Sequence, residues 1–113
     1  LQARVGLFHE NLIEAAALME ANIEEPLSLD EIAALVGVSR RQIERLFSSH
    51  LNTTPVRYMN DLRLAHGRSL LAETDMKVSE VALACGYAST SHFSKSFRKK
   101  YGTSPYRFSH FGG

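Results

Sequence analysis

Apolar side chains recur three and four positions apart along most of this chain, and the strict alternation that marks a half-buried strand is almost absent. The first run of this kind stops before Pro26, because a proline disfavours helix at the residue before it. The pattern therefore predicts an all-α chain that opens with an amphipathic helix. The apolar positions of that helix are Phe8, Leu12, Ala15, Ala16, Met19 and Ile23.

Capping and turn residues predict six more helices. Ser28 with Glu31, and Ser39 with Gln42, form capping boxes that start the second and third helices. Gly37 supplies the left-handed turn between these two helices. The other helices are predicted at about 54–73, opened by Thr54 and Pro55, at about 78–85, ended by Gly86, at about 89–101, and from Ser104 onward.

The sequence contains an internal repeat. Residues 29–37 match residues 78–86 at an offset of 49, and residues 43–55 match residues 93–105 at an offset of 50. Each copy has the order helix, glycine-containing turn, helix, which is the helix-turn-helix unit.

Small and flexible residues fit this geometry. Ala33 and Ala82 allow the two helices of each unit to cross closely, and Gly37 and Gly86 take a backbone conformation that side chains disfavour. We predict two helix-turn-helix subdomains, in residues 1–53 and 74–113. The long central helix 54–73 would join them into one compact domain.

The composition is that of a globular domain, with 44% hydrophobic and 22% charged residues among 113. The single cysteine, Cys85, allows no internal disulfide, which is typical of a reducing compartment and predicts a cytoplasmic protein. No apolar stretch approaches the ~20 residues that span a bilayer, so no membrane partner is expected. The start at Leu1 indicates a trimmed chain or fragment.

Charge is distributed unevenly along the chain. Residues 1–39 carry one basic and seven acidic side chains, whereas residues 40–113 carry 12 basic and five acidic ones. The two parts therefore have net charges of −6 and +7. This asymmetry favours a polyanion partner for the second part, although a solvated surface could also produce it.

The second helix of a helix-turn-helix unit enters the major groove, and its N-terminal half meets the base edges. Arginine pairs with guanine, glutamine with adenine, and hydroxyl groups with either. The predicted base-reading residues are Arg41, Gln42, Glu44, Arg45, Thr90, Ser91, His92 and Lys95; the predicted phosphate contacts are Ser39, Arg40, Ser89, Arg98 and Lys99.

The predicted length of the central helix would allow both units to bind the same duplex. About 20 residues of helix extend roughly 30 Å, and one turn of B-DNA is about 34 Å. A spacer of that length could hold two recognition helices in successive major grooves.

These assignments have plainer alternatives. Arg40, Arg41 and Arg45 could form only a solvated helix face. Glu44 could accept from a cytosine amino group, or could only hold Arg40 or Arg41 in place. His92 could read a base, bind a phosphate, or be an ordinary surface residue.

Other conspicuous residues are predicted to be structural. Phe93, Phe97 and Tyr101 recur at helical spacing and are expected in the core, as are Met19, Met59 and Leu62. Cys85 is expected to be buried, since a redox sensor needs exposure and a lowered pKa. Gly67 inside the long helix costs about 1 kcal/mol against alanine, which close packing against a neighbour would explain.

Two other classes of function fit the sequence less well. A helical protein-interaction module would carry apolar side chains on the exposed faces of the second helices, where this chain has basic and hydroxyl groups. An enzyme would need a nucleophile–base pair, a phosphate-cradling glycine loop or a metal cluster, and the sequence indicates none of these. No cofactor and no metal are expected.

Four stretches of the chain have the residue order of a known family: GVSRRQIERLF at 37–47, ACGY at 84–87, SHF at 91–93 and GTSP at 102–105. They resemble the C-terminal DNA-binding domain of AraC/XylS transcriptional regulators, and the resemblance covers about residues 8–108. Arg63-Leu64 fits the same pattern. Residues 19–27 resemble the GlxA-like branch of this family.

The resemblance implies a bacterial transcription factor that binds double-stranded promoter DNA and contacts RNA polymerase. It also implies an absent N-terminal sensor domain, amidotransferase-like in fold, that binds a small metabolite. By position, it places base-reading sites on Arg41, Glu44 and Arg45 and on Thr90, Ser91, His92 and Lys95.

Two departures from the family pattern stand out. Ser109 occupies a position where the family usually has arginine, so a contact by that side chain is not expected here. Lys77 stands where the first unit has the capping residue Ser28, and this predicts that the following helix frays more easily.

Overall fold

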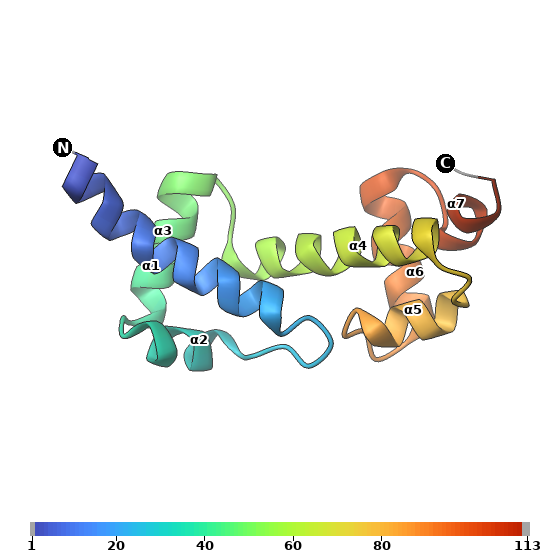
Figure 1. Cartoon of the computed structure of the whole chain (residues 1–113), viewed down its shortest axis with the longest axis horizontal. Helices are drawn as coiled ribbons and strands as arrows, with labels where there is room; N and C mark the ends of the chain where they lie inside the picture. Colours follow the sequence, from blue (N-terminus) through green and yellow to red (C-terminus); the bar gives the residue numbers. More distant parts are fainter. Residues whose placement is uncertain (1, 112–113) are drawn as a thin grey trace. The chain divides into compact units, whose positions relative to one another are not determined.

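The structure is a computed structural model that describes residues 2–111, with side chains from Glu10 onward. Within residues 2–111 there are seven helices and no strand (Figure 1), which confirms the predicted all-α class. The helices are α1 Gln2–Ala21, α2 Leu29–Val36, α3 Arg40–Leu51, α4 Pro55–Glu73, α5 Val78–Ala84, α6 Thr90–Tyr101 and α7 Pro105–Phe111.

The chain divides into two compact units. The first unit comprises the residues up to Asn22 together with Pro26–Asn60, and the second comprises Ile23–Glu25 together with the chain from Asp61 onward. Helix α4 is continuous, so its first turn and a half belongs to the first unit and the rest to the second.

The helices begin where the capping residues predicted. The N–H of Glu31 donates to Ser28 Oγ over 3.1 Å, and the N–H of Ser28 donates to Glu31 Oε1 over 2.9 Å. These hydrogen bonds hold the pKa of Glu31 below its usual value. At the start of α4, the N–H of Arg57 donates to Thr54 Oγ1 over 3.2 Å. Local capping chemistry therefore sets these helix starts.

The core of the first unit forms where α1, α2 and α3 pack together. Its buried side chains have the helical spacing that the sequence predicted, and the ring of Phe47 meets that of Tyr58 edge-on at 5.3 Å. Met59 and Leu62, also predicted as core, are only half-buried, and the side chain of Phe8 lies outside the described part. The buried apolar residues are Leu12, Ala15, Met19, Leu29, Ile32, Ala33, Ile43 and Phe47.

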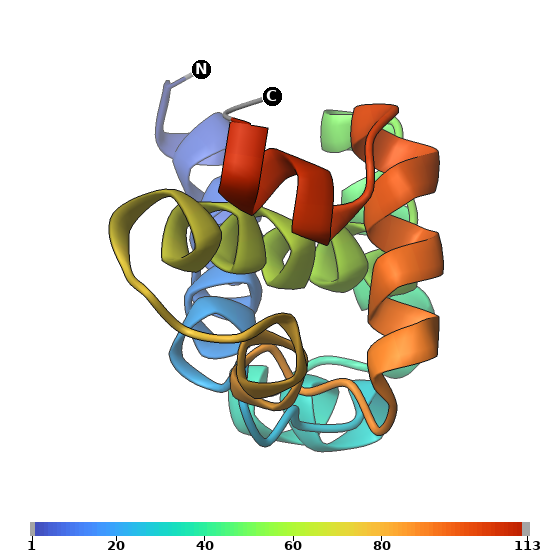
Figure 2. The same ribbon diagram turned by 90° about the vertical axis from the view of Figure 1, so that its right-hand side faces the viewer.

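The core of the second unit is richer in aromatic rings. Figure 2 faces this unit, in which α6 runs from α5 at one end to α7 at the other. Phe93 and Phe97 are fully buried, and Tyr101 packs against the same cluster, as predicted. The cluster of buried residues is Leu64, Leu71, Val81, Ala82, Cys85, Tyr87, Phe93 and Phe97.

Gly67 of α4 lies against this cluster. A Cβ atom at Gly67 would stand 2.8 Å from Cε1 of Phe93 and 3.2 Å from Sγ of Cys85. The close packing that the sequence predicted for this glycine is confirmed. Cys85 is fully buried, and desolvation raises the pKa of its thiol to about 11, so the thiol stays protonated and inert at neutral pH.

Candidate nucleic-acid interface

The basic side chains of helix α3 face outward because its apolar side chains pack into the core on the opposite face. Ile43 and Phe47 are fully buried and Leu46 is half-buried, whereas the polar residues between and before them are exposed. Arg41 and Arg45 lie one helical turn apart and therefore share a face. The exposed candidates on this helix are Arg40, Arg41, Gln42, Glu44 and Arg45.

Two of the candidate side chains in the first unit are occupied by the helix cap. Ser39 Oγ accepts from the N–H of Gln42 over 3.1 Å, and Gln42 Oε1 accepts from the N–H of Ser39 over 3.0 Å. Gln42 Oε1 also accepts from the Ser39 hydroxyl over 3.3 Å. Both lone pairs of the amide oxygen are thus engaged, and only the NH₂ group of Gln42 is left to donate to a base edge. A two-point contact with adenine would require the cap to open.

The salt-bridge partner of Arg40 is not Glu44. Arg40 lies 3.8 Å from Asp30 of α2, so an acid outside α3 restrains it. Glu44 forms no salt bridge with any other residue whose side chain the structure describes. The alternative in which Glu44 merely holds Arg40 is therefore not what the structure contains.

Helix α6 follows the same plan with different chemistry. Ser89 Oγ accepts from the N–H of His92 over 3.1 Å, and Phe93 and Phe97 point into the core. The His92 ring contacts the Tyr87 ring edge-on at 5.2 Å, which orients an otherwise exposed imidazole. The other exposed candidates on this helix are Thr90, Ser91 and Lys95.

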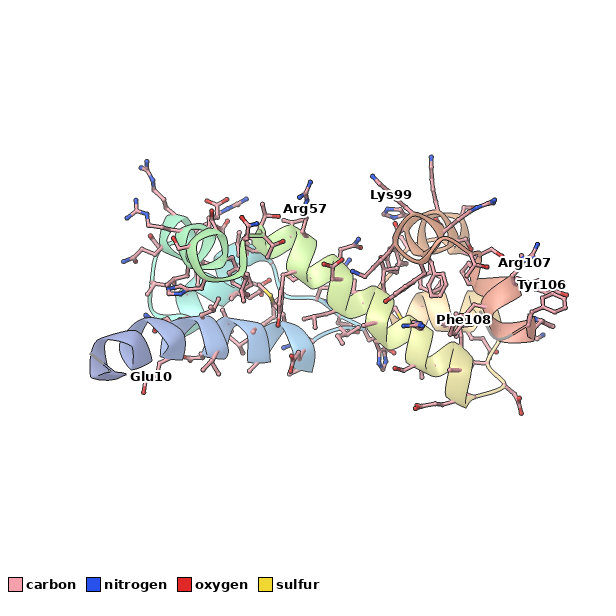
Figure 3. The ribbon with its side chains drawn as sticks, turned by 90° about the horizontal axis from the view of Figure 1, so that it is seen from above. Glu10, Arg57, Lys99, Tyr106, Arg107 and Phe108 are labelled. Atoms are coloured by element: carbon pink, nitrogen blue, oxygen red, sulfur yellow. The ribbon has the colours of Figure 1, made fainter. Side chains whose placement is uncertain are left out.

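Three of the four lysine and arginine residues of α6 are in its last turn, where the helix dipole stabilises positive charge. Lys100 is paired with Asp61 of α4, with 2.9 Å between Nζ and Oδ1. Lys99 projects away from the body of the unit (Figure 3), and Arg98 is likewise exposed. The helix dipole accounts for cations at this end of α6. Arg98 and Lys99 form no salt bridge with a carboxylate among the described side chains, so their charges are available to a partner.

The repeat predicted from the sequence left out one helix of each unit. Leu12, Ala15 and Met19 of α1 are buried at the same spacing as Leu64, Gly67 and Leu71 of α4, at an offset of 52. Each unit is therefore a three-helix bundle followed by a capped helix, and the end of α4 plays the part of α1. The changed offset hid this relation, and the apolar spacing alone could have revealed it.

The described residues contain no candidate for two other kinds of site, a metal centre and a membrane-spanning helix. They contain no group of three His, Cys, Asp or Glu side chains that could hold a metal ion. Among the described helices, none is both long and apolar enough to cross a membrane. The exposed basic and hydroxyl groups of α3 and α6 remain the principal candidate site.

Comparison with known proteins defines the class. Residues 32–110 match a family model described as a helix-turn-helix domain. The chain is 50% identical over 105 residues to the regulator GbdR of Pseudomonas aeruginosa, covering 93% of this chain and 29% of GbdR. It is 36% identical over 102 residues to the regulator GlxA of Rhizobium meliloti, covering 90% of this chain and 32% of GlxA.

Solved structures agree with these relatives. A transcriptional regulator of the AraC-type from Chromobacterium violaceum superposes with a TM-score of 0.86 at 46% identity, covering 93% of this chain and 96% of that one. The DNA-binding domain of AdpA, in complex with a target DNA, superposes with a TM-score of 0.82 at 29% identity, covering 88% and 89%. The chain belongs to the AraC-type helix-turn-helix family of DNA-binding domains, as its sequence predicted.

Proposed function

We propose that this chain is the DNA-binding part of a longer transcriptional regulator, and that α3 and α6 enter the major groove of double-stranded promoter DNA. The observation that carries the proposal is the outward display of basic and hydroxyl side chains on the second helix of both helix-turn-helix units. The solved complex of AdpA with a target DNA supports it by likeness.

The residues have distinct proposed roles. Base edges are read by Arg41, Glu44 and Arg45 with the NH₂ group of Gln42, and by Thr90, Ser91, His92 and Lys95. Phosphates are bound by Arg40, Arg98 and Lys99, while Ser39 and Ser89 act at the helix starts, where backbone N–H groups favour anions.

We further propose that the two units read one duplex in successive major grooves. Helix α4 has 19 residues, a length of about 28 Å, which is close to the ~34 Å of one DNA turn. In this scheme residues 1–53 and 74–113 are the reading subdomains and 54–73 is the linker. A monomer would then bind two sub-sites about one turn apart without a palindrome.

The chain spans 29% of the length of GbdR and 32% of GlxA, so most of such a regulator lies elsewhere. We propose an amidotransferase-like sensor domain for that part, RNA polymerase as a further partner, and the cytoplasm as the place of action. No catalytic activity is proposed for these residues.

Selection of bound sites from random duplexes tests the proposal. We expect enrichment of one motif with two conserved blocks about ten base pairs apart, and affinity that falls steeply with salt as counterions are released. A protein-interaction module would enrich no motif. Duplex affinity that does not change between low and physiological salt would contradict the proposal.

A further inference from the structure

A hollow of about 350 Å³ lies at the end of α6, where the chain turns into α7. Among the described residues, two arginines and two hydroxyl residues line it, and no carboxylate does. Apart from its neighbours along the chain, no described residue has an atom within 4 Å of where a Cβ at Gly102 would stand, so this side of the hollow is open. Its described lining is Arg98, Gly102, Thr103, Ser104, Arg107 and Phe111.

The guanidinium of Arg107 is restrained but electrically uncompensated. Its Cζ lies 5.9 Å from the centre of the Phe111 ring, and it forms no ion pair with a described carboxylate. Ser104 Oγ accepts from the N–H of Arg107 over 3.2 Å, which leaves the Ser104 hydroxyl hydrogen free to donate. The labelled Arg107 can be followed at α7 in Figure 3.

The hollow continues the face of α6 that is proposed to read bases. Ser91, Lys95 and Arg98 are spaced by four and three residues, so they form one row along the helix. If this row of side chains faces the bases of the major groove, the last turn of α6 and the hollow beside it lie near the flanking phosphates.

The internal repeat supplies independent support. At an offset of 50, Arg107 corresponds to Arg57, and Ser104 corresponds to Thr54. Each arginine N–H donates to the capping hydroxyl three residues earlier over 3.2 Å, so the same local turn presents an exposed arginine after each recognition helix. Arg98 corresponds to Ser48, so only the second unit has two arginines at this place.

We propose that Arg107, together with Arg98, holds one phosphate of the DNA backbone in this hollow, and that Arg57 makes the equivalent single contact in the first unit. Arginine suits this role because its guanidinium can donate two hydrogen bonds to one phosphate. This inference rests on the proposed duplex binding and adds to it a backbone clamp that carries no base preference.

The test pairs protein variants with duplexes in which one phosphate at a time is replaced by a neutral methylphosphonate. The duplex is the site recovered by selection. Arg107→Gln should weaken binding about three- to tenfold on every sequence and reduce the salt slope by about one. One methylphosphonate position should weaken binding of the unsubstituted chain yet have little further effect on Arg107→Gln.

Two control variants sharpen the result. Lys77→Gln removes a charge from the same unit outside the hollow and should keep full sensitivity to that methylphosphonate. Arg107→Lys should restore the salt slope and only part of the affinity, because lysine donates as a point charge.

Several outcomes would overturn the proposal. Equal methylphosphonate sensitivity in Arg107→Gln and the unsubstituted chain would remove the contact, and a changed base preference would make Arg107 a base reader. Chemical-shift changes at Arg107 with inorganic phosphate, without any loss of duplex affinity in Arg107→Gln, would assign the hollow to a free anion. If the unsubstituted chain binds no duplex, the proposed function fails as well; in every other case that function stands.

Discussion

The two units share a backbone plan but place their charge at opposite ends of the recognition helix. In α3 the arginines are in the first two turns, at Arg40, Arg41 and Arg45. In α6 the first turn carries hydroxyl residues, Lys95 stands in the middle, and the other three cations are in the last turn. Because the N-terminal half of such a helix meets bases and the flanks meet phosphates, we infer a division of labour. The first unit would contribute most of the charged base contacts, and the second would contribute more backbone affinity.

The cores differ in a complementary way. The first unit has Ala15 and Ile43 where the second has Gly67 and Phe93, and all three side chains are fully buried. The larger ring of Phe93 is accommodated by removing a Cβ atom from the helix beside it. The two cores therefore fill the same space in different ways: the first pairs a small side chain with one of moderate size, and the second pairs a large ring with no side chain.

The largest effect on the stability of the fold is expected from exchanging these volumes. Gly67→Ala should lower the free energy of unfolding by about 1–2 kcal/mol, because overpacking against Phe93 outweighs the gain in helix propensity. Phe93→Ile alone should also destabilise, by leaving a cavity. When Gly67→Ala is already present, adding Phe93→Ile should be nearly neutral. Urea unfolding of the unsubstituted chain, the two single variants and the double variant measures this. Strict additivity would refute the complementary packing.

Arg41→Ala tests the division of labour at the bases. It should cost about 1–3 kcal/mol on the selected site and relax preference at one base pair. Fluorescence anisotropy with a panel of single-base variants measures both effects. An equal loss on every sequence would show that Arg41 contacts a phosphate instead.

The caps of α2 and α5 form the next comparison. Lysine has no acceptor, so α5 retains only the bond from the N–H of Lys77 to Glu80 Oε1, at 2.8 Å, where α2 has the reciprocal pair. Ser28→Ala should destabilise the chain by about 1 kcal/mol and Lys77→Ser should stabilise it by a similar or smaller amount. Unfolding in urea at pH 7 checks both changes.

The cap comparison also has a pH dependence. The pKa of Glu31 is lowered in the folded chain, so its contribution is present above the unfolded value of about 4.5 and is lost as pH falls through the folded value. The cost of Ser28→Ala should therefore shrink in acid. A cost independent of pH would mean that Glu31 takes no part in the cap.

The smallest effect is expected at the far end of α6. Lys99→Ala should weaken binding by less than about 1 kcal/mol at physiological salt, uniformly across sequences, and should lower the salt slope by about one. Anisotropy titrations at several salt concentrations measure the slope. A changed base preference would contradict the assignment of this end of the helix to the backbone.

Local chemistry explains how far the sequence alone could reach. The caps Ser28, Ser39 and Thr54 and the turn at Gly37 act within four residues, so they predicted helix boundaries to within a residue or two. The Lys100–Asp61 pair and the hollow beside Arg107 join segments that no local rule connects. Gln42 matched two sequence patterns, a capping box and a contact with adenine, and both need its amide oxygen. In the structure the cap engages that oxygen.

Helix α4 has a consequence for dissecting the molecule. Leu64, Gly67 and Leu71 belong to the hydrophobic interior of the second unit, although they precede its helix-turn-helix motif in the chain. A fragment cut at residue 74 would lack one wall of its own interior and should be molten or insoluble. A fragment that begins at Pro55 keeps that wall, so the smallest autonomous piece of this half is longer than the motif that defines it.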